Sequence, residues 1–150
     1  MLSVIIDARR DADRLPALLA QLTAGAVDGL VRQVAIVAAP GQPGIDALCE
    51  DMGADAHPTL PAAARAARAD RVLALPVAFR LRDGWIAALE MHLAGGGTQA
   101  VVAGLKEGGL FSRAPSGVLV ERRLLEECGD GVDVGGVRRL LGLRGGRRIG

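Results

Sequence analysis

Charged and turn-forming residues follow three apolar runs of the chain. The segments concerned are Asp7–Asp11, Ala38–Gly44 and Pro76–Arg82. In a sheet of parallel strands, ligands bind at the carboxyl ends of the strands, so these segments are expected to form the binding site. Arginine side chains in the first and third segments can hold phosphate groups through paired hydrogen bonds. Recognition of a small phosphorylated ligand is therefore one chemistry that the sequence allows.

Two of these segments lack the side chains that bind divalent cations. Magnesium and calcium need oxygen ligands, chiefly carboxylates. Ala38-Ala39 and Pro76-Val77-Ala78 offer only backbone oxygens. We therefore predict that residues 76–78 hold no divalent ion and that the protein uses no cofactor. Cys49 and Cys128 are too few for a zinc site and are predicted to be small buried hydrophobic residues.

Several familiar catalytic motifs are missing from the sequence. There is no Gly-x-x-x-x-Gly-Lys-Ser/Thr loop, no Gly-x-Ser-x-Gly elbow, and no Gly-x-Gly-x-x-Gly after the first apolar run. These absences argue against P-loop, hydrolase and dinucleotide chemistry. The two histidines, His57 and His92, are not next to a serine or cysteine, and we expect them to be surface or capping residues.

Length and composition indicate one domain. The chain has 150 residues, of which 50% are hydrophobic, and this suffices for one core spanning residues 1–150. Its net charge is +1 and its aromatic content is 2%, so a base-stacking surface and a nucleic-acid partner are not expected. Charge interrupts the first apolar run at Asp7, and no run is long enough to cross a bilayer. We therefore expect a cytoplasmic protein.

Hydrophobic periodicity predicts strands that alternate with helices. The predicted strands are Ser3–Ile6, Gln33–Ala38, Ala54–His57, Arg71–Leu75, Gln99–Ala103 and Gly117–Val120. The predicted helices run through Leu15–Leu22 (capped by Asp11 or Asp13), Ile45–Met52, Pro61–Ala69, Asp83–Ala94, Arg122–Cys128 and Val134–Leu143. This order, with continuous apolar strands, is typical of an α/β fold: a mostly parallel sheet with helices on both faces.

Two further expectations concern the middle and the end of the chain. Val4–Ile6, Ala35–Val37 and Val72–Leu75 are unbroken aliphatic runs, so they should be adjacent, buried central strands. The chain ends in a group of five arginines: Arg138, Arg139, Arg144, Arg147 and Arg148. They could make peripheral contact with lipid headgroups. A solvated, frayed tail is the interpretation that the lack of aromatic residues favours.

The order and spacing of these elements resemble family 2 glycosyltransferases over nearly the whole chain. Val4–Leu15 is similar to the opening strand and turn of that family, with Asp11 at the position of its Glu and Ala8 in the turn. Val34–Val37 is similar to its second strand, but Ala38 stands where the family has the Asp that holds the nucleotide. The resemblance implies a GT-A fold and a nucleotide-sugar ligand.

The later motifs of the family are present in altered form. Pro76-Val77-Ala78 occupies the place of the metal-binding Asp-x-Asp motif, and Arg80-Leu81 follows it as in the family. Gly41 and Gly44 remain from a glycine loop whose Asp is replaced by a proline. Asp133 lies in the region of the family's catalytic base, with Val132 in place of the preceding Glu.

Two hypotheses follow from this resemblance. In the first, the chain transfers a sugar from a nucleotide-sugar donor to an acceptor without a metal. Arginines would then stabilise the leaving diphosphate, with Arg9, Arg10, Arg80 and Arg113 as candidates, and Asp133 would be the general base. In the second, the chain is a catalytically inactive GT-A-like module kept for binding or assembly, and Asp133 is an ordinary loop acid or helix cap.

Overall fold

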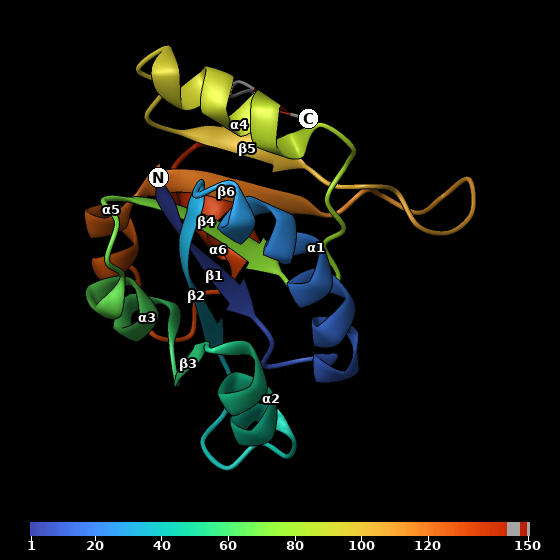
Figure 1. Ribbon diagram of the computed structural model, residues 1–150, viewed down its shortest axis with the longest axis vertical. Helices are drawn as coiled ribbons and strands as arrows, with labels where there is room; N and C mark the ends of the chain where they lie inside the picture. Colours follow the sequence, from blue (N-terminus) through green and yellow to red (C-terminus); the bar gives the residue numbers. More distant parts are fainter. Residues whose placement is uncertain (144–147, 150) are drawn as a thin grey trace.

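Seven strands form one sheet in the order β3-β2-β1-β4-β6-β5-β7. Figure 1 shows the computed structural model, which describes residues 1–143, 148 and 149. The strands are β1 (Leu2–Asp7), β2 (Val31–Val37), β3 (Asp55–His57), β4 (Arg71–Pro76), β5 (Ala100–Ala103), β6 (Ser116–Glu121) and β7 (Arg148–Ile149). The helices are η1 (Ala12–Arg14), α1 (Leu15–Val27), α2 (Ile45–Met52), α3 (Leu60–Ala66), α4 (Trp85–Ala94), α5 (Arg122–Glu126) and α6 (Val134–Leu140).

The three predicted central strands are adjacent and buried, so that prediction is confirmed. β1 pairs in parallel with β2 on one side and with β4 on the other, with Ile5 opposite both Ala35 and Ala74. Ile5 and Ala74 are fully buried, and Ala35 is 2% exposed. Such continuous burial on both faces is the reason that these strands are unbroken aliphatic runs.

Helices cover both faces of the sheet, as the sequence predicts. Val4 and Ile6 pack on one face with the apolar residues of α1, α2 and α4. Ile5 packs on the other face with residues of α3, α5 and α6. Side chains alternate between the two faces along a strand, so neighbouring residues of β1 pack in two different cores, one on each face of the sheet.

The second half of the sheet departs from parallel order. β6 pairs antiparallel with β4 and with β5, while β5 and β7 are parallel to each other. The sheet is thus mixed but mostly parallel. Because β6 runs in reverse, its last residue, Glu121, is paired with the first residue of β4, Arg71. This reversal brings the start of α5 to the amino-terminal edge of the parallel strands.

Three local expectations are wrong. Neither Asp11 nor Asp13 caps the first helix, since Arg14 is the residue before α1 and η1 precedes it without a side-chain cap. His92 is buried, with 4% exposure, rather than on the surface. The expected frayed tail is ordered at Arg148–Ile149, which pair with β5. Arg144 and Arg147 lie outside the described residues.

None of the helices in the described part of the chain is long and apolar enough to span a bilayer.

The packing of α1 predicts a large effect at Gly25. A Cβ at this position would collide with the ring of Trp85, at the start of α4, and would lie 2.9 Å from Cγ2 of Val31. We expect Gly25→Ala to lower the free energy of unfolding by about 1–3 kcal/mol despite the better helix propensity of alanine. Urea titration measures this. Gly109→Ala is the control, since a Cβ there meets nothing within 4 Å, and an equal loss in both variants would contradict the packing argument.

Candidate functional site

A pocket of about 410 Å³ lies at the carboxyl ends of β1 and β4. Figure 1 shows the arrowheads of β1 and β2 pointing toward the end of the molecule that carries α2. The pocket is lined by residues from three segments, Asp7–Asp11, Pro76–Ala78 and the loop that leads into α6: Asp7, Arg9, Arg10, Asp11, Pro76, Val77, Ala78, Gly131, Asp133, Val134 and Gly135. The first two segments are ones that the sequence predicts for a binding site, and the volume is in the usual range for small-molecule sites.

Arg9 joins the end of β1 to the loop before α6. Its Nε donates to Oδ1 of Asp7 at 2.9 Å and its Nη2 donates to Oδ2 at 2.8 Å, a paired contact with a carboxylate that is only 11% exposed. The same guanidinium donates to the carbonyl of Val132 at 2.9 Å and to that of Asp130 at 3.2 Å. Arg9 is therefore a positioning residue that holds residues 130–132 against the strand.

The charges around Arg9 favour its protonated form. The hydrogen bond with Asp7 raises the pKa of Arg9 above its ordinary value, partial burial opposes this, and the charges of Asp7 and Asp133 add to the rise. Arg9 is therefore a cation at neutral pH, the form in which it donates to the carbonyls of the loop.

Asp133 lies in the pocket at the first turn of α6. Its Oδ1 accepts a hydrogen bond from the backbone N–H of Gly136 at 2.7 Å, so it is the N-cap of the helix. Its Oδ2 has no hydrogen-bond partner among the described residues. The cap fixes the direction of the carboxylate and leaves one oxygen free to accept a proton from a ligand.

Asp11 and Arg10 complete the charged wall of the pocket, and both are exposed. Asp11 has φ 53°, which makes it the one described residue other than glycine with a positive φ. Aspartate is among the few residue types that tolerate this left-handed conformation. The guanidinium of Arg10 makes no hydrogen bond or ion pair within the described part of the chain, so it is available to a ligand.

Ala8 and Ala38, predicted as substrate-binding residues, are both buried, and they contribute backbone groups. The carbonyl of Ala8 accepts a hydrogen bond from Nε2 of Gln42 at 2.9 Å, and Oε1 of Gln42 accepts one from the N–H of Ala39 at 2.9 Å. Ala38 lines a smaller pocket of about 200 Å³ at the ends of β2 and β3, together with Gln42 and His57. The Gln42 amide thus satisfies one backbone acceptor after β1 and one backbone donor after β2.

Arg80 and Arg113 do not line the pocket that contains Asp133. The guanidinium of Arg80 donates to the carbonyls of Phe79, Val77 and Arg14 at 2.7, 3.1 and 3.2 Å, and its side chain is 12% exposed. It also forms an ion pair with Glu107 at 3.7 Å. Arg113 is exposed in the connection between β5 and β6. The structure therefore brings Asp11 and Asp133 together and leaves these two arginines apart from them.

The described residues contain no group of three or more His, Cys, Asp or Glu side chains that could hold a metal ion. Pro76, Val77 and Ala78 line the pocket as the sequence predicts, without a carboxylate. That ligand binding needs no metal ion stays a prediction, and titration of ligands with and without manganese tests it.

Sequence reasoning missed two features of the site. One is the pairing of Asp7 with Arg9, although an acid and a base two residues apart at a strand end are a signal for such a contact. The other is the amide of Gln42, which no motif identified because its partners are backbone groups from two different strand ends.

No known family model matches the chain, and no curated protein matches it. Solved structures do. Glucosyl-3-phosphoglycerate synthase from Mycobacterium tuberculosis, bound to Mn2+, UDP and glucosyl-3-phosphoglycerate, is 17% identical with a TM-score of 0.66, covering 99% of this chain and 68% of that one. Mannosyl-3-phosphoglycerate synthase from Rubrobacter xylanophilus is 17% identical with a TM-score of 0.59, covering 83% and 54%. The 4-diphosphocytidyl-2C-methyl-D-erythritol synthase from Anaerococcus prevotii is 10% identical with a TM-score of 0.59, covering 99% and 86%.

These likenesses establish the fold. The chain has a GT-A-like α/β fold. Glycosyltransferases and nucleotidyltransferases among the solved structures have the same fold. The resemblance to a GT-A domain in the sequence is thereby confirmed at the level of architecture.

Proposed function

We propose that this chain binds a nucleotide sugar at the carboxyl edge of its sheet and transfers the sugar to an acceptor hydroxyl without a metal ion. The observation that carries this proposal is the carboxylate of Asp133, which is fixed as a helix cap and has one free oxygen in a pocket beside Arg10. A neighbour of the same fold was solved with Mn2+, UDP and glucosyl-3-phosphoglycerate bound, which supports a donor of this class. The absence of a metal in the proposal rests on residues 76–78 of this chain, which carry no carboxylate.

The proposed step moves one proton and one sugar. Oδ2 of Asp133 takes the proton from the acceptor hydroxyl, and the acceptor oxygen attacks the anomeric carbon. The bond between that carbon and the diphosphate oxygen breaks, and the electron pair leaves with the diphosphate. The acceptor then carries the sugar and Asp133 carries the proton until it is lost to water.

The leaving diphosphate needs a positive partner when no metal neutralises it. Arg10 fits this role because it lines the pocket and its guanidinium has no protein partner among the described residues. Arg9 is held by Asp7 and two carbonyls and contributes its charge from a fixed position. In the proposal, Arg9 therefore orders the loop of the base and Arg10 contacts the diphosphate.

We expect Arg10→Ala to weaken nucleotide-sugar binding by about tenfold, since charge-assisted contacts to phosphate are among the stronger hydrogen bonds. Isothermal titration in EDTA, with UDP- and GDP-sugars, measures the change. Arg82→Ala is the matched control, because Arg82 is also exposed and lines a different pocket. Equal affinities for Arg10→Ala and the unmodified protein would remove Arg10 from the site.

A second function, a binding or assembly module without catalysis, is favoured by Gln42. Its amide is hydrogen-bonded to the carbonyl of Ala8 and the N–H of Ala39, so these two backbone groups at the strand ends are not available to a ligand. A thermal-shift screen of nucleotides and nucleotide sugars separates the two functions. A donor at a hundredfold excess over its dissociation constant adds about 2.7 kcal/mol of stability, whereas the module predicts no shift with any of them.

A further inference from the structure

A larger cavity, of about 740 Å³, lies at the opposite edge of the sheet. Its lining residues come from the amino-terminal ends of β1, β2 and β4, the end of β6 and the start of α5. They are Met1, Arg32, Arg68, Ala69, Asp70, Arg71, Glu121, Arg122 and Arg123. Five of the nine are arginines. The carboxyl ends of the parallel strands, with Asp133, are at the other edge, so this cavity does not belong to the site described above.

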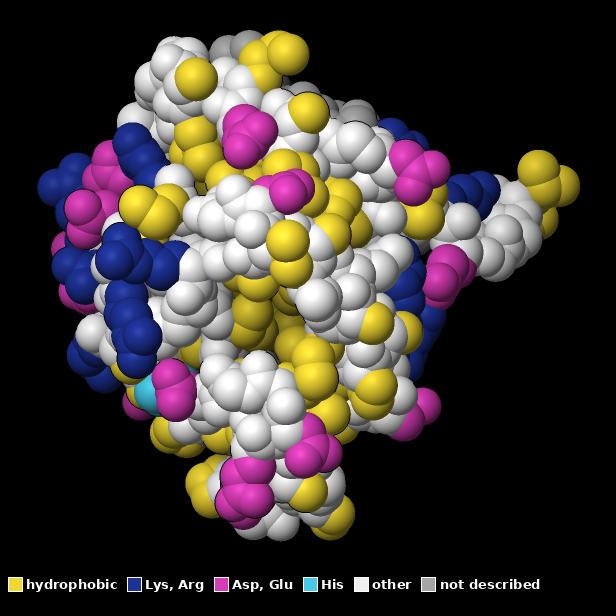
Figure 2. All heavy atoms as spheres, in the orientation of Figure 1, with side chains coloured by type: hydrophobic (Ala, Val, Ile, Leu, Met, Phe, Trp, Pro, Cys, Tyr) yellow, Lys and Arg dark blue, Asp and Glu magenta, His cyan; other side chains and the backbone are white. Residues whose placement is uncertain are grey.

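The cavity concentrates positive charge. Its lining carries five arginines and two acids, a formal excess of three, whereas the whole chain has a net charge of only +1. Figure 2 shows dark-blue side chains gathered on the side of the molecule that carries α3 and α5. The rest of the chain is slightly acidic, so the positive charge is concentrated at this cavity. Such a local concentration of positive charge points to an anionic ligand rather than to a general adaptation for solubility.

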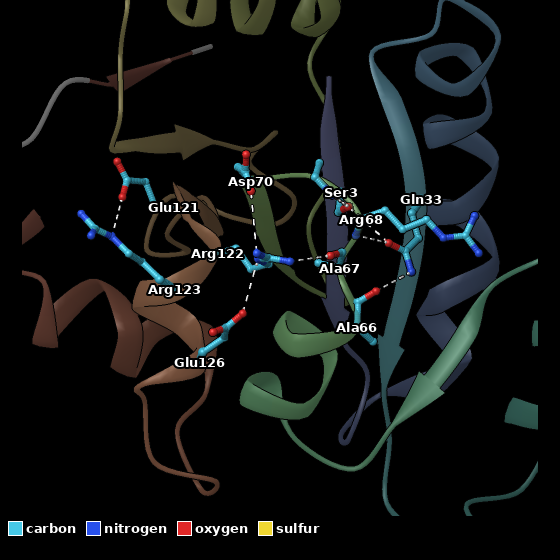
Figure 3. Close-up of polar contacts among 11 residues, drawn as sticks. Ser3, Gln33, Ala66, Ala67, Arg68, Asp70, Glu121, Arg122, Arg123 and Glu126 are labelled. Atoms are coloured by element: carbon cyan, nitrogen blue, oxygen red, sulfur yellow. Dashed lines mark hydrogen bonds and ion pairs between the residues drawn. The ribbon is translucent and has the colours of Figure 1, made fainter.

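Ion pairs hold three of these arginines in place. Arg123 and Arg71 share the carboxylate of Glu121, at 2.8 and 3.3 Å, and Figure 3 shows the contact with Arg123. Arg122 lies between Glu126 and Asp70, at 3.4 and 3.8 Å, and donates to the carbonyl of Ala67 at 3.1 Å. Because two arginines share one carboxylate, their positive charge is only partly neutralised.

Arg32 and Arg68 have no carboxylate partner among the described residues. The backbone N–H of Arg68 donates to Oε1 of Gln33 at 2.9 Å, which fixes the loop before β4, but its guanidinium forms no hydrogen bond or ion pair within the described part of the chain. In Figure 3 that guanidinium extends past Gln33 without a contact. Arg32 makes a single long contact, 3.8 Å, with the sulfur of Met1. Both side chains are exposed and free to turn toward a ligand.

We propose that this cavity binds a small ligand carrying several phosphate groups. Planar guanidinium groups match phosphate oxygens in pairs, and no lysine lines the cavity. Its volume is within the range of small-molecule sites, which fits a compact polyanion. A nucleic acid is disfavoured, because no aromatic side chain lines the cavity to stack a base.

Titration with inorganic tripolyphosphate tests the proposal. We expect tripolyphosphate to bind the unmodified protein saturably. Its affinity should fall about tenfold in Arg68→Ala and about a hundredfold in Arg32→Ala/Arg68→Ala. Arg68→Lys should have an affinity between those of Arg68→Ala and the unmodified protein. Arg65→Ala is the matched control, since Arg65 is exposed on α3 but does not line the cavity. Arg10→Ala removes one of the two arginines that line the pocket at the other edge and should leave this binding within about twofold, since the two sites are separate.

Several results would overturn the proposal. Binding neither to tripolyphosphate nor to anionic vesicles would mean that the arginines form only a solvated ion-pair network. Tripolyphosphate binding that the double variant leaves unchanged would place the anion at another part of the protein. A single-stranded oligonucleotide that binds more tightly than tripolyphosphate, through the same arginines, would assign the surface to nucleic acid. Arginine-dependent binding to vesicles with anionic lipids, with none to tripolyphosphate, would assign it to a membrane surface. Thermal melts of each variant confirm that it is folded before binding is compared.

Discussion

Replacing Asp133 with asparagine is expected to reduce sugar transfer by about a hundredfold or more, since a positioned general base contributes 10²–10⁴-fold to a rate. Asparagine caps a helix as well as aspartate does, so the hydrogen bond to the N–H of Gly136 is kept and the fold is not disturbed. Donor affinity should change by less than about twofold, because the proton is taken from the acceptor rather than from the donor. Initial rates and isothermal titration measure the two quantities.

Asp130→Asn is the matched control for this prediction. Asp130 is an exposed acid three residues earlier in the same loop, and Arg9 contacts its backbone carbonyl rather than its carboxylate. Asp130→Asn should keep full activity. If Asp133→Asn and Asp130→Asn have the same activity as the unmodified protein, Asp133 is a helix cap and not a base.

Replacing Arg9 with methionine is expected to lower the free energy of unfolding by about 1–3 kcal/mol, because removing one partner of a partly buried ion pair leaves the other charge uncompensated. Asp7 is 11% exposed and Arg9 23% exposed, so water replaces the lost contacts poorly. The carbonyls of Asp130 and Val132 lose their donor at the same time. Urea or thermal unfolding measures the loss.

Two further variants distinguish the ion pair from packing. Arg10→Met should change stability by less than about 0.5 kcal/mol, since Arg10 is exposed and has no protein partner among the described residues. Asp7→Leu/Arg9→Met should recover part of the loss of Arg9→Met, because no charge is then left alone. A double variant less stable than either single variant would show that the loop depends on these residues in another way.

The sequence predicted the central fold well because burial dictates it. The strand residues 4–6, 35–37 and 72–75 are apolar on both faces, a pattern that few other structures satisfy. α2 begins and ends where the sequence predicts, at Ile45 and Met52, because Gly53 adopts the left-handed conformation that ends a helix.

Other elements depend on tertiary contacts that no local pattern contains. α3 ends at Ala66 rather than at Ala69 because Ala67 is extended and the N–H of Arg68 is bonded to the side chain of Gln33. β7 is a two-residue strand that exists through pairing with β5. β6 runs in the reverse direction after the connection 104–115, and the composition of that connection does not specify a turn type.

The candidate site was predictable in position but not in detail. Asp11 reaches the pocket because it follows the carboxyl end of β1, one edge of the parallel strands. Asp133 reaches it because Arg9 holds the loop before α6 at the same edge, a contact that no local pattern predicts. Arg80 follows a strand end as well, but nearby carbonyls satisfy its guanidinium and direct it away from the pocket. The direction of a long side chain depends on such neighbours, and the sequence does not reveal them.

Mapping of amide chemical shifts on nitrogen-15-labelled protein tests the central claim most directly. The donor that gives the largest thermal shift is added in the presence of EDTA. Binding at the carboxyl edge predicts saturable shifts at the amides of residues 7–11, 77, 78 and 131–135, with amides 67–71 and 121–123 at the opposite edge unchanged. No shift with any nucleotide sugar, or shifts confined to the opposite edge, would contradict the proposed function.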